Sequence, residues 1–161
     1  GMSPRFNFHG FVNERGGDKN HGYTQIFRIG GLEATMACLA REHEGKNVIP
    51  GRGVEECIFR NLPMYIKGLK ELGVPTPLIV MFTLEGVSGA KYAVFSHGFF
   101  DVDAPLTENT LQLPECIIEE YGSELDYHKA VRPAFDTLWN AIGFAKSQFF
   151  NEEGRWVGDR K

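Results

Sequence analysis

Three residues near the middle of the chain have side chains suited to hydrolytic or metal-dependent chemistry: His97, Asp101 and Asp103. A histidine titrates near neutral pH and serves as a general base or a metal ligand, and carboxylates serve in acid–base catalysis. The residues that follow Asp103 do not continue an EF-hand calcium loop, so no known motif assigns these side chains a metal. One hypothesis is therefore a small hydrolase or metal-dependent enzyme that uses the segment 97–103.

A second candidate is an anion-binding site at Gly51, Arg52 and Gly53, which open a predicted helix. The free N–H groups and the dipole at a helix start attract a phosphate or a carboxylate, and an arginine adds positive charge. The segment is neither a P-loop nor a dinucleotide-binding motif, because the later glycine and the lysine are missing. Glu55 and Glu56 are expected in the first helical turn, where they would repel an anion. A structural loop is therefore the alternative to an anion site.

The stretch 101–126 is acidic and contains no lysine or arginine. Such a stretch is a solvated surface, a face for a basic protein partner, or a metal site. The partners we expect are a basic protein at this face or a second copy of the chain. The acidic residues are Asp101, Asp103, Glu108, Glu115, Glu119, Glu120, Glu124 and Asp126.

The three cysteines, Cys38, Cys57 and Cys116, are widely spaced. Their odd number and spacing argue against a disulfide framework and a zinc site, so we expect no bound metal and no cofactor. Cys57 could form a nucleophile pair with His97 or His128. However, it lies on or beside an apolar helical stripe, where a buried thiol is unreactive. A core cysteine is the interpretation we favour.

Two helices are predicted from the spacing of apolar residues. The first covers about 53–72 and the second about 130–146. Pro63 lies inside the first, where proline removes a hydrogen bond and clashes with the preceding turn. We expect a kink there, or a break with Asn61 capping a second helix.

Strands and tight turns account for much of the remaining chain. Alternating apolar residues predict a strand over 6–12. Two further strands, over 23–29 and 32–38, are joined by Gly30 and Gly31, and this pattern is typical of a hairpin.

A continuous apolar run over 77–84 predicts a central strand that is covered on both faces. Residues 91–96 are expected to be its hairpin partner. Because hairpins outnumber β-α-β units, we predict an α+β fold: a mostly antiparallel sheet packed with the two helices.

The chain has 161 residues, of which 42% are hydrophobic and 24% charged, as is typical of one globular domain. We expect a single domain over 2–161 that ends in a polar tail, 151–161. Gly1 resembles a scar of tag removal, and Met2 is the expected native start.

The composition also bears on location and partners. The first residues carry no signal peptide and no apolar run is long enough to span a membrane, so we expect a cytoplasmic protein with no membrane partner. A net charge of -4 and an isoelectric point of about 5.7 argue against nucleic acid as a partner of this chain alone.

A series of short motifs follows in order along most of residues 23–156. They are Tyr23–Gly30, Glu33-Ala34, Val48–Pro50, Leu62–Tyr65, Leu72–Val74, Gly86–Gly89, Leu113–Glu115, Arg132–Asp136, Leu138–Ala141 and Asn151–Trp156. In this order they resemble the region that follows the AlbA/Schlafen-type DNA-binding domain in bacterial proteins labelled as transcriptional regulators or ATP-binding proteins.

The resemblance implies a stand-alone copy of an accessory domain, because the AlbA/Schlafen-type domain itself is absent. It therefore assigns no DNA contact and no catalytic residue to this chain. The residues that match its recurring pattern are Arg28, Glu33, Arg132, Trp139, Asn140 and Arg155. The leading hypothesis is a non-enzymatic regulatory domain that binds a ligand or a protein. A small enzyme is the first alternative, and direct nucleic-acid binding is the second.

Overall fold

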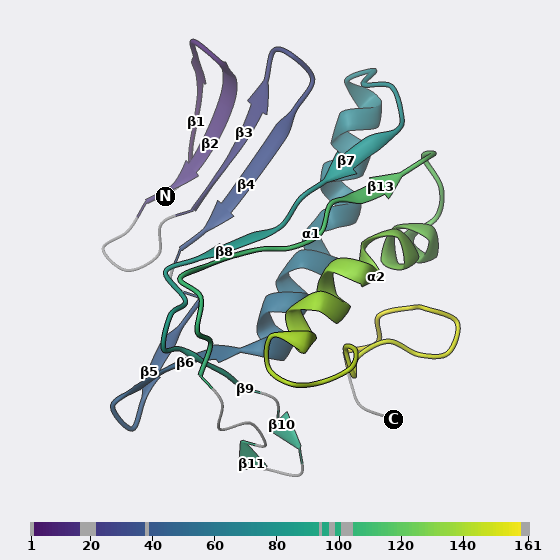
Figure 1. Cartoon of the computed structure of the whole chain (residues 1–161). Helices are drawn as coiled ribbons and strands as arrows, with labels where there is room; N and C mark the ends of the chain where they lie inside the picture. Colours follow the sequence, from purple (N-terminus) through teal and green to yellow (C-terminus); the bar gives the residue numbers. More distant parts are fainter. Residues whose placement is uncertain are drawn as a thin grey trace. The chain divides into compact units, whose positions relative to one another are not determined.

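A computed structural model describes residues 2–16, 22–37, 39–93, 95–96, 99–100 and 105–158 (Figure 1). Within these ranges it has two helices and thirteen strands, and all but one of the strand pairs are antiparallel, which confirms the predicted α+β class. The elements are β1 (Met2–Asn7), β2 (Gly10–Arg15), β3 (Gly22–Phe27), β4 (Leu32–Met36), β5 (Arg41–His43), β6 (Lys46–Pro50), α1 (Gly51–Glu71), β7 (Leu78–Val80), β8 (Thr83–Glu85), β9 (Lys91–Ala93), β10 (Phe95–Ser96), β11 (Phe99–Phe100), β12 (Thr110–Gln112), β13 (Cys116–Ile118) and α2 (Glu124–Asn140).

The chain forms two compact units. Unit 1 comprises Gly1–Leu39 and Met64–Val74, and unit 2 comprises Ala40–Pro63 and Pro75–Lys161. Helix α1 contributes to both units, because the division falls directly after Pro63. The expectation of a single domain over 2–161 stays a prediction.

Unit 1 contains one antiparallel sheet in the order β1-β2-β3-β4. The predicted hairpin across Gly30 is confirmed, and Gly30 has a φ of +88°, a conformation that glycine adopts without strain. The single strand predicted over 6–12 is wrong. The chain turns at Phe8 and His9, so that the end of β1 pairs with the start of β2.

Unit 2 contains a long two-stranded ribbon, which we define as residues 78–85 and 110–118. Strand β7 pairs with β13 so that Ile79 lies opposite Ile117, and β8 pairs with β12. The predicted pairing of 77–84 with 91–96 is wrong. Residues 86–90 hydrogen-bond to residues 106–109 instead of closing a hairpin, and β9 pairs in parallel with β6.

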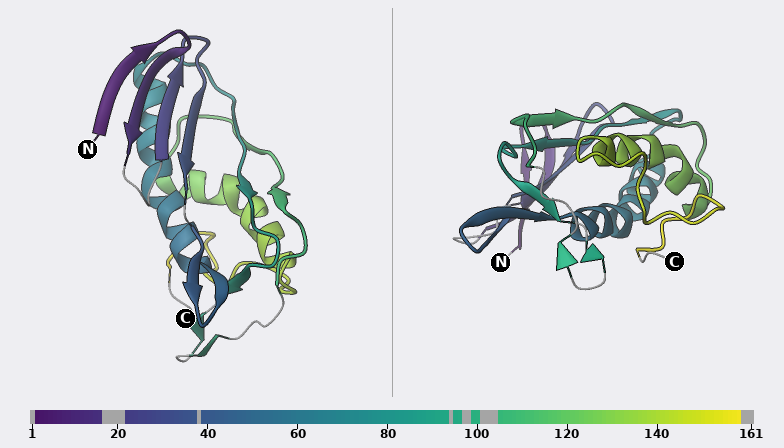
Figure 2. Two further views of the ribbon diagram at one scale, coloured as in Figure 1. Left: turned by 90° about the vertical axis from the view of Figure 1, so that its left-hand side faces the viewer. Right: turned by 60° about the horizontal axis from the view of Figure 1, so that its bottom comes forward.

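The ribbon is covered on one face only, so the expectation that 77–84 is covered on both faces is wrong. Leu78 and Leu84 are buried, whereas Ile79 and Met81 are exposed. This alternation is the pattern of an antiparallel strand with one side packed and one side open. Figures 1 and 2 show the two halves of the ribbon running side by side, and α2 packs against β13.

Helix α1 begins two residues before its predicted start and continues through Pro63. The predicted break with Asn61 as a cap is therefore wrong. Asn61 lies inside the helix, where its side-chain amide donates to the carbonyl of Cys57 at 2.7 Å. Neither α1 nor α2, the two helices of the described residues, is long and apolar enough to cross a membrane.

Helix α2 lies six residues earlier than the predicted 130–146. Its start is set by a capping box: Ser123 Oγ accepts from the Asp126 N–H at 3.3 Å, and Asp126 Oδ2 accepts from the Ser123 N–H at 2.7 Å. Its end is followed by a turn in which Asn140 Nδ2 donates to the carbonyls of Phe144 and Ala145. These side-chain to backbone contacts, rather than apolar spacing, determine both ends.

The core of unit 2 is largely aromatic. Phe59 of α1 lies at its centre, with ring centroids 4.7 Å from His128, 4.9 Å from Phe135 and 5.2 Å from Trp156. Trp139 of α2 contacts a second group of rings that includes Tyr92 and Phe149. The fluorescence of both tryptophans of the chain therefore reports on the folding of unit 2.

Candidate functional site

The residues of the enzyme hypothesis, His97, Asp101 and Asp103, lie outside the described residues. That hypothesis therefore stays a prediction. In the part of the chain that the structure describes, no group of three or more histidine, cysteine, aspartate or glutamate side chains is arranged to hold a metal ion.

The predicted anion site lies at the start of α1. Gly51 is buried, and the hydroxyl of Tyr92 donates to its carbonyl at 3.2 Å. The prediction that Glu55 and Glu56 lie in the first helical turn is wrong. Because α1 begins at Gly51, both residues lie in the second turn. Arg52 is exposed. Packing against Tyr92 accounts for the glycine at position 51, and anion binding stays a prediction.

Gly51→Ala is expected to lower the free energy of unfolding of unit 2 by about 1–3 kcal/mol. A Cβ atom at position 51 would lie 2.3 Å from Cε1 of the Tyr92 ring, which is fully buried, so the ring or the helix start must shift. Gly53→Ala is the matched control, because its nearest neighbour would be Pro50 at 3.4 Å and alanine favours a helix. Urea unfolding of both variants tests the prediction. Equal stability of the two variants would contradict it.

Of the three cysteines, the structure describes Cys57 and Cys116; Cys38 and His97, the other predicted partner of Cys57, lie outside the described residues. Cys116 is buried and its Sγ lies 3.8 Å from the carbonyl of Val131; burial raises the pKa of this thiol. Cys57 accepts a contact from Asn61 Nδ2 at 3.6 Å. His128, one of its two predicted partners, uses Nδ1 to accept the Trp156 N–H at 3.0 Å. The nitrogen that would act as a base is therefore engaged.

Among the side chains of unit 2 that the structure describes, the exposed large apolar ones lie on the outer face of the ribbon. Ile79 is 63% exposed, Met81 60% and Ile117 53%, and Ile79 and Ile117 lie directly opposite each other. We call these three residues the apolar strip. The inner face, by contrast, is buried against α2 through Cys116 and Ile118.

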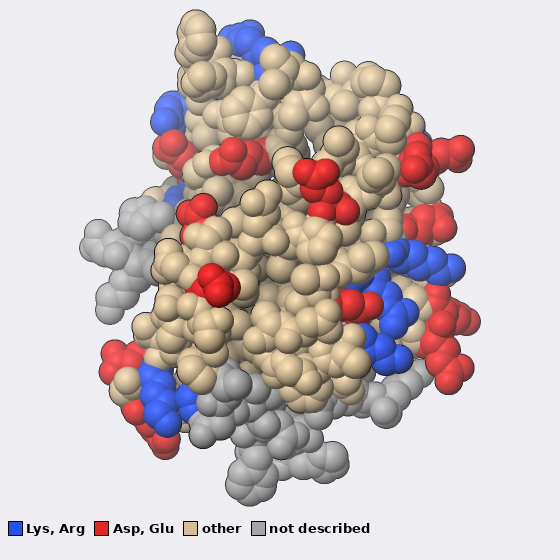
Figure 3. Space-filling view, viewed as in Figure 1, with Lys and Arg blue, Asp and Glu red and all other residues tan. Residues whose placement is uncertain are grey.

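The charges around the apolar strip are all negative along both halves of the ribbon. Residues 72–90 and 105–128 contain no lysine or arginine. Glu115 and Glu119 are exposed two residues on either side of Ile117, and Glu85 is exposed at the end of β8. In Figure 3 the surface over β7 and β13 is mostly uncharged, with carboxylates among and beside it.

The described part of the predicted acidic face runs from the loop before β12, through the ribbon, to the first turn of α2. Its six acidic residues are all exposed: Glu108, Glu115, Glu119, Glu120, Glu124 and Asp126. Asp101 and Asp103 lie outside the described residues. The apolar strip was not predicted: Ile79 and Met81 were expected in a strand covered on both faces, and Ile117 was assigned no role.

A second unusual feature of unit 2 is a fully buried glutamate, Glu55 of α1. Its carboxylate accepts the indole N–H of Trp139 at 2.6 Å and that of Trp156 at 2.8 Å. The hydroxyl of Ser147 lies 3.2 Å and 3.3 Å from the two carboxylate oxygens. Burial raises the pKa of Glu55 to about 7, against the opposing effect of these hydrogen bonds.

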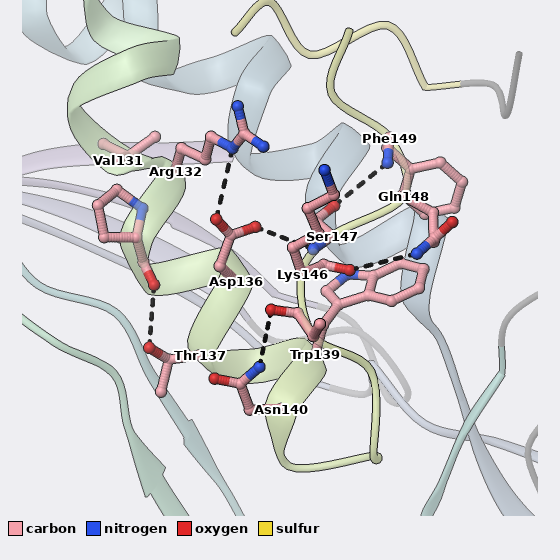
Figure 4. Close-up of polar contacts among 12 residues, drawn as sticks. Val131, Arg132, Asp136, Thr137, Trp139, Asn140, Lys146, Ser147, Gln148 and Phe149 are labelled. Carbon is pink, nitrogen blue, oxygen red and sulfur yellow. Dashed lines mark hydrogen bonds and ion pairs between the residues drawn. The ribbon is translucent and has the colours of Figure 1, made fainter. Parts of the chain in front are cut away.

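The residues that bind Glu55 are themselves held in place by α2. Asp136 accepts the backbone N–H of Ser147 at 2.9 Å and pairs with Arg132 at 3.4 Å, as Figure 4 shows. The position of Glu55 carried a usable signal: it precedes Phe59 and Leu62 by four and seven residues, on the buried side of α1.

No protein-family model, no curated protein and no solved structure matches this chain. The resemblance to the region that follows the AlbA/Schlafen-type domain therefore stays a prediction.

Proposed function

We propose that this chain is a non-enzymatic binding domain whose unit 2 binds a basic protein segment on the outer face of the ribbon. The observation that supports this function is the apolar strip: three large side chains are more than half exposed, and the charged residues along both halves of the ribbon are all carboxylates.

Apolar contact would supply most of the binding free energy. Burying a branched or long apolar side chain completely is worth about 1.5–3 kcal/mol. Ile79, Met81 and Ile117 are each partly covered already, so their remaining surface contributes on the order of 3 kcal/mol in total. That amount suits a transient partner rather than a permanent subunit.

Charge would select the partner. Glu85, Glu115 and Glu119 border the apolar strip, so a segment that carries lysine or arginine beside apolar side chains is attracted, and an acidic segment is repelled. The attraction between exposed charges is screened by salt, and the binding is expected to weaken as the ionic strength rises.

The test uses two fluorescently labelled peptides of equal length, one alternating leucine with lysine and the other leucine with glutamate. Fluorescence anisotropy should show binding of the lysine peptide to the full chain. The double variant Ile79→Ser with Ile117→Ser should weaken that binding by about tenfold or more, which corresponds to 1.4 kcal/mol. Charge reversal with Glu115→Lys and Glu119→Lys should shift the preference toward the glutamate peptide.

The control is Phe8→Ser, which removes an apolar side chain that is 90% exposed but lies in unit 1. It should leave the affinity for the lysine peptide unchanged. The proposal is wrong if both peptides bind equally well, or if the double serine variant binds the lysine peptide as the wild type does.

A further inference from the structure

The segment from Ser147 to Val157, which we call the C-terminal segment, contains no helix and only one isolated bridge, between Phe150 and Trp156. Its ring contacts include the stacking of Trp156 on Phe59 at 5.2 Å. Figure 2 shows this segment (yellow) returning beside the helices of unit 2. Side-chain contacts therefore hold its position: Phe149 and Phe150 pack on Trp139 and Phe59, and polar groups of α1 and α2 bind its two ends.

Two of these contacts involve buried groups that can gain or lose a proton. Glu55 binds the hydroxyl of Ser147 and the indole of Trp156, at the two ends of the C-terminal segment. His128 accepts the backbone N–H of Trp156, which it can do only while Nδ1 carries no proton.

We propose that the C-terminal segment is a clasp held closed by two proton-sensitive anchors, Glu55 and His128, which respond to pH in opposite directions. Ionisation of Glu55 makes the closed position of the C-terminal segment less favourable as the pH rises. Protonation of His128 makes the closed position less favourable as the pH falls.

The effect of Glu55 follows from its surroundings. Tyr92 of β9 and Asp136 of α2 are the titratable groups that face it, and Asp136 adds to the effect of burial in raising the pKa of Glu55 to about 7. When the clasp opens, water reaches the carboxylate and its pKa falls toward the ordinary value. The closed form is therefore favoured at low pH, and this preference is lost as the pH rises to about 7.

The effect of His128 has the opposite sign. Burial lowers the pKa of His128, Arg155 of the C-terminal segment lowers it further, and Glu124, with Oε1 at 3.5 Å from Nε2, opposes both. The closed form therefore favours neutral His128. This contribution is complete above the ordinary histidine pKa and is lost as the pH falls through the lowered value.

The test measures hydrogen exchange of the C-terminal segment, relative to that of α2, between pH 5 and pH 8.5. In Glu55→Gln only the titration of His128 remains, so the protection of the C-terminal segment should be lost progressively on acidification. In His128→Asn, whose amide oxygen can still accept the Trp156 N–H, protection should fall on alkalinisation instead. Glu56→Gln is the matched control, since the neighbouring Glu56 has a side chain that is 40% exposed and pairs with Arg60, and it should behave as the wild type does.

A measurement on the wild type alone keeps the proposal testable if a variant fails to fold. Both indole N–H groups of the chain donate to Glu55, so their two NMR signals should shift together with one midpoint near pH 7. The proposal is overturned if these signals do not move between pH 5 and pH 8.5, or if either variant shows a slope of the opposite sign.

Discussion

Phe59→Ala should lower the free energy of unfolding of unit 2 by about 3–5 kcal/mol, as is typical for loss of a buried aromatic ring. Phe59 is 4% exposed and lies within 5.5 Å, between ring centroids, of His128, Phe135, Phe150 and Trp156. These rings belong to α1, α2 and the C-terminal segment. The alanine variant would lose the free energy gained by burying the ring away from water. It would also lose the van der Waals contacts of the ring, because the cavity left behind has no atoms to replace them.

Urea unfolding followed by tryptophan fluorescence measures this effect, because Trp139 and Trp156 both lie in unit 2. Met81→Ala is the matched control: its side chain is 60% exposed, and its loss should cost less than about 1 kcal/mol. Phe59→Leu should fall between the two. A loss below 1 kcal/mol for Phe59→Ala would show that Phe59 is not the centre of the core.

The elements that local signals define could be predicted from the sequence. The hairpin at Gly30 follows from two β-rich runs separated by glycines, and the first helix follows from its apolar spacing. The second helix was placed six residues late because its start depends on the reciprocal hydrogen bonds of Ser123 and Asp126, which apolar spacing does not reveal.

The apolar strip could not be predicted, for a physical reason. A continuous apolar run has the same pattern whether a second layer covers it or not, so the exposure of Ile79 is decided by the absence of packing on the outer face of the ribbon. The buried role of Glu55 depends on Trp139 and Trp156, which follow it by 84 and 101 residues. Helical spacing from Phe59 and Leu62 indicates the buried side of α1, but no local pattern contains the hydrogen-bond partners of Glu55, and a glutamate is normally a surface residue.

The stability of unit 2 should depend on pH through Glu55, and the difference between the wild type and Glu55→Gln isolates that dependence. Burial raises the pKa of Glu55 from its ordinary value of 4.5 to about 7, so the folded state holds this proton more tightly than the unfolded state. The resulting stabilisation is complete below pH 4.5 and is lost as the pH rises to about 7. The wild type should therefore lose about 3 kcal/mol relative to Glu55→Gln across this range.

Subtracting the two unfolding free energies at each pH cancels the titration of every other group, including His128, whose effect has the opposite sign. The matched control is Glu56→Gln, one residue along α1, where the side chain is exposed to solvent and pairs with Arg60 at 2.5 Å. An exposed pair of this kind contributes little, so the difference for this variant should stay nearly constant with pH. A constant difference for Glu55→Gln as well would mean that its three hydrogen-bond donors fully compensate for burial, and that Glu55 stays ionised in the folded protein.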